Sequence, residues 1–452
     1  GELTVEVGGK LTIRDVSGTN VHGISMANGT LKVYGEIEID GVTGGGYGAN
    51  ISGNSVITSV KDGALVETGK LTIKNVGYGI AFHGNAVAEL AELVCENNSK
   101  SCLYVDGANN QVTVHKANLG GGTTVAETNV NIKKGTVTVR NATLNKTKNA
   151  NVSLADGTLT LNDVVIKGSN TGNGVAVSKP ATLKGDHITI ESTKGIGLSN
   201  AGVTDVSNLT ITGVGSHAIM NDGTAAKLTV TGATIGGSTG NNRLIALKNG
   251  STTTLKGDVT IDASGASSND AICFYGGNAT LNVEGNVVIR NISNHGIHAN
   301  GTHASTPGKN DKVNITGTLT IEKVTGNAIL LDAENSAVTV AQGGKLIIRE
   351  PMQPDRGLML LTMNLRGSAE VLDRILTERP ELEVVQLQFN YADMEDPKVQ
   401  SRACWEVCRK HGKPILVMEP VKGGTLAAIP AEAEALLGGE APAHRALRFA
   451  AS

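Results

Sequence analysis

The chain is poor in aromatic residues, strong net charge and long hydrophobic runs. Aromatics make up 2% of the 452 residues, and the formal net charge is −3 with both signs interspersed. Nucleic-acid binding needs a basic surface, and single-strand binding also needs stacking rings, so we expect no nucleic-acid partner. No apolar run approaches the ~20 residues of a transmembrane helix, so we expect no membrane span in this chain.

Cysteine is scarce as well. Cys95 and Cys102 bracket a short loop, and the sequence leaves open either a disulfide across a corner or two buried thiols. Cys404 and Cys408 lie four residues apart on one face of a predicted helix, with no further ligand at metal-binding spacing. We therefore expect no metal at this pair. Cys273 stands alone in the middle of the chain.

One short phrase recurs before position 350. Its clear copies are residues 11–16 (LTIRDV), 71–76 (LTIKNV), 209–214 (LTITGV) and 319–324 (LTIEKV), and weaker copies lie at 37–42, 159–164 and 287–292. Within each copy the apolar residues alternate, which is the period of a β-strand. A polar residue followed by Gly or Ala and then Ile or Val recurs between the copies, as does a third short alternating run after an Asn, Asp or Gly turn.

Three short strands per unit, at roughly 26-residue spacing, predict a solenoid in which each coil stacks on the next. We expect a right-handed parallel β-helix of about 13 coils over residues 1–350, roughly 60 Å long at the usual strand spacing. No stretch of 12 residues there has the apolar spacing of a helix without a glycine break. A β-sandwich is the alternative fold, but its strands would not repeat so literally.

Three histidines, His295, His298 and His303, form the most suggestive cluster for a metal. The repeat weakens this interpretation, because His22, His217 and His295 share one slot with residues such as Asn173 and Asp270. We interpret that slot as a polar corner position, and we expect no metal site.

A second slot, near the end of the repeated phrase, holds Asp15, Asp163, Asn75 and Asn291. Paired carboxylates on one sheet could hydrolyse glycosidic bonds, so a polysaccharide-active enzyme is a weaker alternative. Asp and Asn also favour turns, and the slot is as often Asn, Gly or Lys. We expect turn residues here and no catalytic residue. The glycine runs at 44–46 and 120–122 are loops, because no Lys-Ser/Thr or helix follows them.

By repeat style, residues 1–350 resemble the passenger domain of bacterial autotransporters and related adhesin-like proteins. That resemblance implies an extracellular or cell-surface rod whose loops bind a host surface, a glycan or another cell-surface ligand. Neither a leader nor a ∼10-residue alternating pattern of a membrane barrel is present in the sequence, although this family is expected to have both.

The repeat stops after Glu350, and the composition changes. Only Pro180 and Pro307 precede this point, whereas eight prolines and the single Trp405 follow it. We divide the chain into the repeat domain (1–350), a junction (351–365) and a second segment (366–452). The second segment predicts helices at 369–379 and 399–411, with Ser368 as N-cap, and strands at 384–389 and 415–418, in the order of a parallel α/β sheet.

The motifs at 369–376 (AEVLDRIL), 385–391 (VQLQFNY), 396–402 (DPKVQSR) and 412–424 (GKPILVMEPVKGG) resemble the aldo/keto reductase family. That family consists of NADPH-dependent (β/α)8 barrels. The resemblance implies cofactor-binding roles for five residues: Gln386, Met418, Glu419, Val421 and Gly423. The catalytic Asp, Tyr, Lys and His of the family match no residue here, and about 250 residues are needed for a barrel.

The second segment therefore predicts a truncated barrel without a catalytic site, and a fusion of two unrelated parts. We expect no cofactor in this chain alone, and NADP only if the segment is completed. The alternative function is an NADPH-dependent oxidoreductase module whose missing strands come from another chain. A cytoplasmic location would follow if this segment determined it.

Overall fold

The computed structural model describes residues 1–240, 242–264, 269–302, 305–349, 369–380, 382, 384–434 and 440–451. The chain divides into two compact units, Gly1–Asp355 and Arg356–Ser452, and each is described by itself. The predicted junction at 351–365, the N-cap Ser368 and His303 lie outside the described residues.

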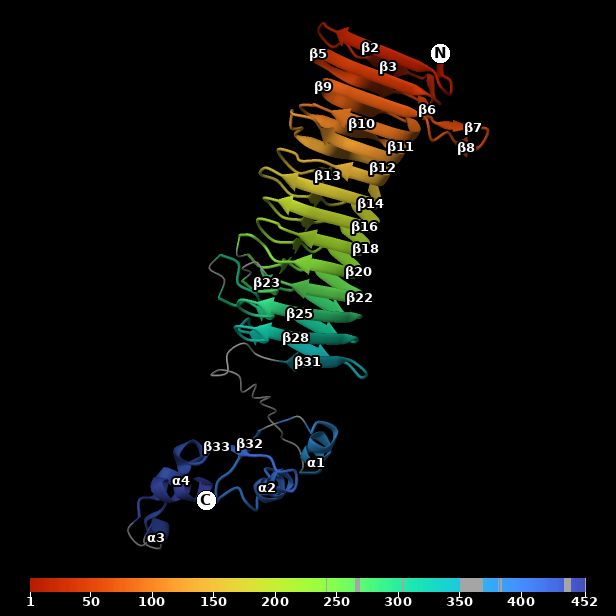
Figure 1. The fold of residues 1–452 in the computed structure, drawn as a ribbon. Coiled ribbons are helices and arrows are strands. Elements are labelled where there is room, and N and C mark those ends of the chain that lie inside the picture. The colour runs from red at the N-terminus through yellow and green to blue at the C-terminus, as the bar shows by residue number, and fades with distance from the viewer. Residues whose placement is uncertain are drawn as a thin grey trace. The chain divides into compact units, whose positions relative to one another are not determined.

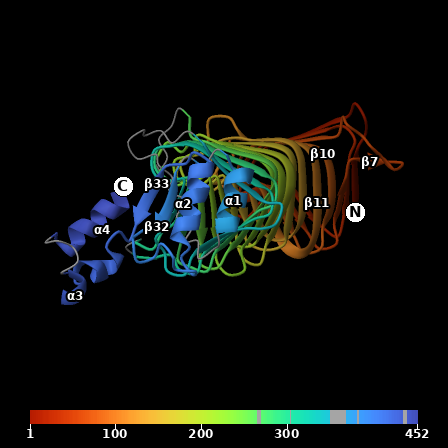
Figure 2. The same cartoon turned by 90° about the horizontal axis from the view of Figure 1, so that it is seen from below.

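The first unit is a right-handed parallel β-solenoid of about 14 turns, which confirms the predicted fold type and nearly the predicted number of coils. Each turn adds one strand to each of three faces, and the strands stack in parallel along the rod (Figure 1). Seen from below, successive turns follow one another around a common interior (Figure 2). The described residues of this unit contain no α-helix, as the sequence predicts.

We number the faces in chain order, so that the first face begins at β1, the second at β2 and the third at β3. The first strands are β1 (Glu2–Val5), β2 (Lys10–Val16), β3 (Ile24–Ala27), β4 (Thr30–Val33), β5 (Glu36–Ser52), β6 (Val56–Thr58), β9 (Lys70–His83), β10 (Val87–Glu96), β11 (Ser101–Gly121), β12 (Thr128–Leu144), β13 (Val152–Leu154), β14 (Thr158–Ser169), β15 (Val175–Val177) and β16 (Thr182–Thr193). A small antiparallel hairpin, β7 (Val60–Lys61) with β8 (Ala64–Leu65), is inserted after β6.

The rod continues through shorter turns of the same kind. Its remaining strands are β17 (Leu198–Asn200), β18 (Val203–Thr212), β19 (Ile219–Asp222), β20 (Lys227–Gly236), β21 (Ile245–Lys248), β22 (Thr252–Asp262), β23 (Ile272–Tyr275), β24 (Thr280–Val283), β25 (Asn286–Ile292), β26 (Ile297–Ala299), β27 (Lys312–Ile315), β28 (Thr318–Val324), β29 (Ile329–Leu331), β30 (Ala337–Val340) and β31 (Lys345–Arg349).

The interior of the rod is a continuous stack of aliphatic side chains. The inward column of the second face passes through Ile37, Leu71 and Leu93, each at most 1% exposed. Because each strand is too short to bury an apolar face alone, this stacking supplies the stability of every turn. Gly79 shows why the polar–Gly/Ala–Ile element uses small residues, since a Cβ there would lie 2.3 Å from the carbonyl oxygen of the next turn.

One prediction about the repeat was wrong in phase. The column that contains Leu11 reaches Val164, not Leu159, so the weak copy at 159–164 lies on the first face. The alternation has the same period on all faces, so a short run does not reveal which face it occupies. Asp163 therefore stands at a different corner from Asp15 and Asn75.

The predicted turn role of these residues is confirmed. Asp15, Asn75, Asp163 and Asn291 all have positive φ, between 53° and 58°. Asn and Asp tolerate this left-handed conformation better than other non-glycine residues, because their short polar side chains bond locally. No pair of carboxylates results from this slot, because its members are separated between corners and alternate with amides.

The second unit has the predicted order of elements. It contains α1 (Ala369–Glu378), β32 (Val385–Gln388), α2 (Ser401–Lys410), β33 (Ile415–Met418), the 3₁₀-helix η1 (Lys422–Ala427), α3 (Ala431–Glu434) and α4 (Pro442–Ala451). The strands β32 and β33 pair in parallel, and Leu372, Leu376, Cys404 and Cys408 form the core beside them. The described part of this unit holds two strands and no closed barrel. Among the described residues, no helix is both long and apolar enough to cross a membrane.

Candidate functional site

The polar slot that contains His22 and His295 is a corner position that ties one turn to the next. His22 Nδ1 and His295 Nδ1 each accept a hydrogen bond, at 3.0 and 2.9 Å, from a backbone N–H of the following turn. Asn173 Oδ1 accepts an equivalent bond at 3.0 Å. His217 Nδ1 bonds instead to the carbonyl oxygen of Arg243, at 2.9 Å. These bonds are the structural role that the sequence predicts for the slot.

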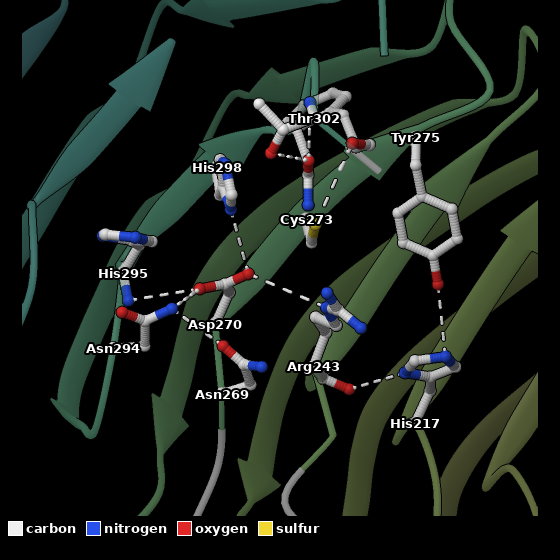
Figure 3. Close-up of polar contacts among 12 residues, drawn as sticks. His217, Arg243, Asn269, Asp270, Cys273, Tyr275, Asn294, His295, His298 and Thr302 are labelled. Carbon is white, nitrogen blue, oxygen red and sulfur yellow. Dashed lines mark hydrogen bonds and ion pairs between the residues drawn. The ribbon is translucent and has the colours of Figure 1, made fainter. Parts of the chain in front are cut away.

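A network of charged groups surrounds one member of this slot, Asp270, whose side chain is 1% exposed (Figure 3). Asp270 Oδ1 accepts from Asn294 Nδ2 at 2.8 Å and from the His295 backbone N–H at 3.3 Å. Asp270 Oδ2 lies 3.1 Å from His298 Nδ1 and 3.8 Å from Arg243 Nε.

The second imidazole nitrogen of His298 faces another carboxylate, because Nε2 lies 3.3 Å from Asp332 Oδ1. Burial by itself lowers the pKa of His298, but the two carboxylates outweigh it, so the pKa is raised. Burial tends to raise the pKa of Asp270, yet the hydrogen bond and charge of His298 leave it lowered. We call Arg243, Asp270, Asn294, His298 and Asp332 the Asp270 network; it pairs its buried charges with one another.

The network includes a set of potential metal ligands. One ligand atom from each of Asp270, His295 and His298 lies within 4.8 Å of the others. His295 Nδ1 accepts a backbone hydrogen bond, which places the proton on its Nε2. Asp270 already has donors on both oxygens, and the raised pKa of His298 favours its protonated form. The hydrogen bonds therefore leave this triad without the free lone pairs that a metal needs.

The neighbouring groups are also unsuited to nucleophilic chemistry at neutral pH. Burial raises the pKa of the Cys273 thiol to about 12 and that of the Tyr275 hydroxyl to about 12. The Tyr275 hydroxyl lies 3.2 Å from His217 Nε2, and burial lowers the pKa of His217. A reactive thiolate needs a lowered pKa, so Cys273 is a buried thiol in a structural position.

The other cysteines of the rod are free and buried in the structure. Cys95 Sγ lies 3.7 Å from the carbonyl oxygen of Cys102, and Cys102 Sγ lies 3.4 Å from Asn129 Oδ1. Of the two arrangements that the sequence leaves open for this pair, the structure has the buried thiols.

The most exposed concentration of rings lies on the third face near the N-terminal end of the rod. It consists of five half-buried side chains, His22, Tyr47, Tyr78, His83 and Tyr104, which we call the aromatic patch. The centroids of Tyr47 and Tyr78 are 5.0 Å apart, and those of Tyr78 and Tyr104 are 5.8 Å apart. His83 lies 5.7 Å from both Tyr47 and Tyr104. In a chain with 2% aromatics, this grouping is a distinct surface.

The patch is built by the strands β3, β5, β9 and β11, which carry its residues or lead directly from them. Tyr47 and Tyr78 are register partners in adjacent strands, so the solenoid itself brings their rings together. His22 also fixes this corner, since its Nε2 lies 3.2 Å from Asn50 Nδ2. The rings are therefore held by backbone pairing and need no flexible loop to place them.

In the second unit, the residues predicted to bind a cofactor gather at the carboxyl ends of β32 and β33. Gln386 lies on β32, Met418 ends β33, and Glu419, Val421 and Gly423 follow β33 directly, with Gly423 inside η1. Gln386 Oε1 is buried and has no hydrogen-bond partner among the described residues.

Sequence reasoning missed two features. Asp393, 1% exposed, accepts from Gln388 Nε2 and Asn390 Nδ2 at 2.7 Å each and pairs with Lys422. The aromatic patch was missed although a signal existed, because Tyr47-Gly48-Ala49 fits the polar–Gly–apolar element and places Tyr47 in the same slot as Tyr78.

The fold defines a parallel β-solenoid with a small helix-rich second unit. No family model matches the chain, and no curated protein matches it either. Function is therefore argued from the geometry of the surface.

Proposed function

We propose that residues 1–350 act as an adhesin-like rod that binds a host surface, a glycan or another cell-surface ligand. The observation that carries this proposal is the aromatic patch, because half-buried tyrosines on a rigid face are typical binding residues. An extracellular or cell-surface location, as in the autotransporter passengers that the repeat resembles, fits this role. The paired charges of the Asp270 network and the turn positions of Asp15 and Asn75 support binding over catalysis.

The proposal is tested by labelling the full chain and measuring its binding to cultured epithelial cells and to bacterial cells. We expect saturable binding to at least one of them, and the double variant Tyr47→Ala/Tyr104→Ala should lower the affinity about a hundredfold, at roughly tenfold for each ring. The control Val203→Ala changes an apolar side chain that is 40% exposed on the first face. Equal binding by the double variant and the control would refute the role of the patch.

A second function is favoured by one observation in the second unit, the unpartnered buried oxygen Gln386 Oε1. A nicotinamide carboxamide would supply the missing donor, and NADPH would supply hydride if a partner chain provided the catalytic groups. Gln386 would hold the amide, Met418 would lie against the ring, and Glu419, Val421 and Gly423 would line the pyrophosphate.

This alternative predicts saturable enhancement of NADPH fluorescence by the full chain, and loss of most of it in Gln386→Leu. Leu416→Ala, which shortens a 44% exposed side chain on β33, is the matched control. If wild-type protein leaves NADPH fluorescence unchanged, with or without cell extract as a source of the partner chain, the oxidoreductase reading fails.

A further inference from the structure

The aromatic patch follows the rod axis and does not run around a turn. Tyr47, Tyr78 and Tyr104 come from three successive turns, and each ring lies within 6 Å of the next. Adjacent turns are separated by about 4.8 Å, so the three rings form a ladder that spans about 10 Å along the axis. A ligand that contacts all three rings must itself be extended in this direction.

The ladder is electrically neutral near pH 7. Burial, with Tyr78 and Asp106 adding to it, raises the pKa of Tyr47, and burial with Asp106 raises that of Tyr104 to about 12. Burial lowers the pKa of His83, which keeps this imidazole uncharged. The one carboxylate in direct contact with the rings is Asp106, whose Oδ2 accepts from the Tyr104 hydroxyl at 3.1 Å. Such a surface offers nothing to neutralise sulfate, phosphate or sialate groups.

Unused hydrogen-bond acceptors lie beside the rings. Asn50, Ala81, Tyr104 and Asn131 are successive outward residues of one column on the third face. Asn50 Oδ1 and Asn131 Oδ1 are buried atoms with no hydrogen-bond partner among the described residues. Buried acceptors without partners are unfavourable, so a ligand that brings donors to both ends of this column would be stabilised.

These features select one ligand chemistry. A peptide that adds as a β-strand needs a free sheet edge, but the strands that carry the patch are paired on both sides in the solenoid. A sugar ring has an apolar C–H face that stacks on tyrosine and a rim of hydroxyl donors that suits amide and carboxylate oxygens. A linear chain of such rings also repeats at a spacing close to that of the turns.

We propose that the aromatic patch binds a neutral, linear oligosaccharide that lies along the rod axis, with its rings on Tyr47, Tyr78 and Tyr104 and its hydroxyls on Asn50, Asp106 and Asn131. The inference rests on the proposed function, since it names the ligand class of the same surface. Ala81 has no side chain beyond Cβ, so the column leaves space between the polar ends for the sugar chain.

The test uses the full chain and calorimetric titration with neutral hexasaccharides of β-linked glucose, β-linked mannose and β-linked N-acetylglucosamine. The corresponding disaccharides and a heparin-derived hexasaccharide are titrated in parallel. We expect at least one neutral hexasaccharide to bind about tenfold more tightly than its disaccharide, because the longer chain reaches more rings, and to bind more tightly than the heparin fragment. This comparison needs no variant, so it does not depend on how a substitution folds.

Variants then locate the site. Tyr78→Ala should weaken hexasaccharide binding about tenfold, Tyr78→Phe should retain it, and Val203→Ala should leave it unchanged. Tighter binding of the heparin fragment, no dependence on chain length, or an unaffected Tyr78→Ala variant would each overturn the inference. Failure of all sugars together with patch-dependent binding to cells would overturn only the ligand class and would point to a protein ligand, whereas failure of both would also remove the proposed function.

Discussion

Replacing His298 with alanine is expected to destabilise the rod by about 3 kcal/mol near pH 6, because the change removes the partner of a buried carboxylate. His298 lies 3.1 Å from Asp270 Oδ2 and 3.3 Å from Asp332 Oδ1. Without it, Asp270 keeps only its bonds to Asn294 and the His295 N–H and the more distant Arg243 guanidinium. Urea unfolding followed by circular dichroism, with hydrogen exchange at β23 and β26, measures the loss.

The destabilisation should depend on pH in a defined direction. The pKa of His298 in the folded rod is raised above its ordinary value of 6.5. The stabilisation from its charged form is therefore fully present below about pH 6.5 and is lost as the pH rises through the folded-state pKa. The difference between wild type and His298→Ala should accordingly be larger at pH 6 than at pH 9.

His115→Ala is the matched control for this prediction. His115 Nε2 lies 3.0 Å from Glu89 Oε1, but this pair is at the surface, with the glutamate side chain 46% exposed. Surface pairs contribute about 0–1 kcal/mol, so the control should lose little stability. Comparable losses in the two variants would mean that the Asp270 network has no special energetic role.

Replacing Asp311 with asparagine is expected to stabilise the rod by about 2–3 kcal/mol at pH 7. Asp311 is 1% exposed; its Oδ1 accepts from the Ala279 N–H at 2.9 Å, whereas Oδ2 is buried without a hydrogen-bond partner among the described residues. Asn110 occupies the equivalent corner four turns or more earlier in the chain, and its Nδ2 donates to a backbone carbonyl at 3.1 Å. An amide at position 311 supplies the same donor without a buried charge.

The pH dependence of this gain follows from the carboxyl group itself. Burial raises the pKa of Asp311 from 3.8 to about 6, against the opposing effect of backbone hydrogen bonds from Ala279 and Lys309. Between these values the folded state holds more protons than the unfolded state, so the stability of the wild type falls as the pH rises. Asp311→Asn should therefore match the wild type near pH 4 and exceed it at pH 7 in thermal or urea unfolding.

Asp262→Asn provides a control with the opposite sign. Its pKa is lowered to about 2, because hydrogen bonds from Asn291, Ser264 and Arg290 outweigh the effect of burial. This variant should lose stability at pH 7, and the loss should fade as the pH falls toward 2. If Asp311→Asn also lost stability at pH 7, the assignment of a strained buried carboxyl would be wrong.

Much of the rod could be predicted from local patterns alone. The repeated Leu and Ile of residues 11–16 alternate at the strand period, and that period specifies an inward and an outward face. The positive-φ corners were predictable for the same reason, since Asp15 and Asn75 occupy a slot that Gly also fills in other turns. The order of helices and strands after position 369 was equally readable from its periodicity.

The number of turns and their phase were less accessible, because the turns differ in length. Val137 pairs with Leu159, 22 residues later, whereas Leu281 pairs with Val313, 32 residues later. An average spacing of roughly 26 residues hides this variation and misplaced residues 159–164 by one face. Long-range register depends on loop lengths that no local pattern encodes.

The sequence by itself determined the solenoid, its stacked aliphatic interior and its polar corners, since each of these depends on residues within a few positions of one another. Only the tertiary structure decided which distant side chains meet on the outer surface. Tyr47 and Tyr104 became neighbours of Tyr78, and His298 came between Asp270 and Asp332, because pairing between turns aligns residues across loops of unequal length. The binding surface and the buried charges are consequences of that alignment.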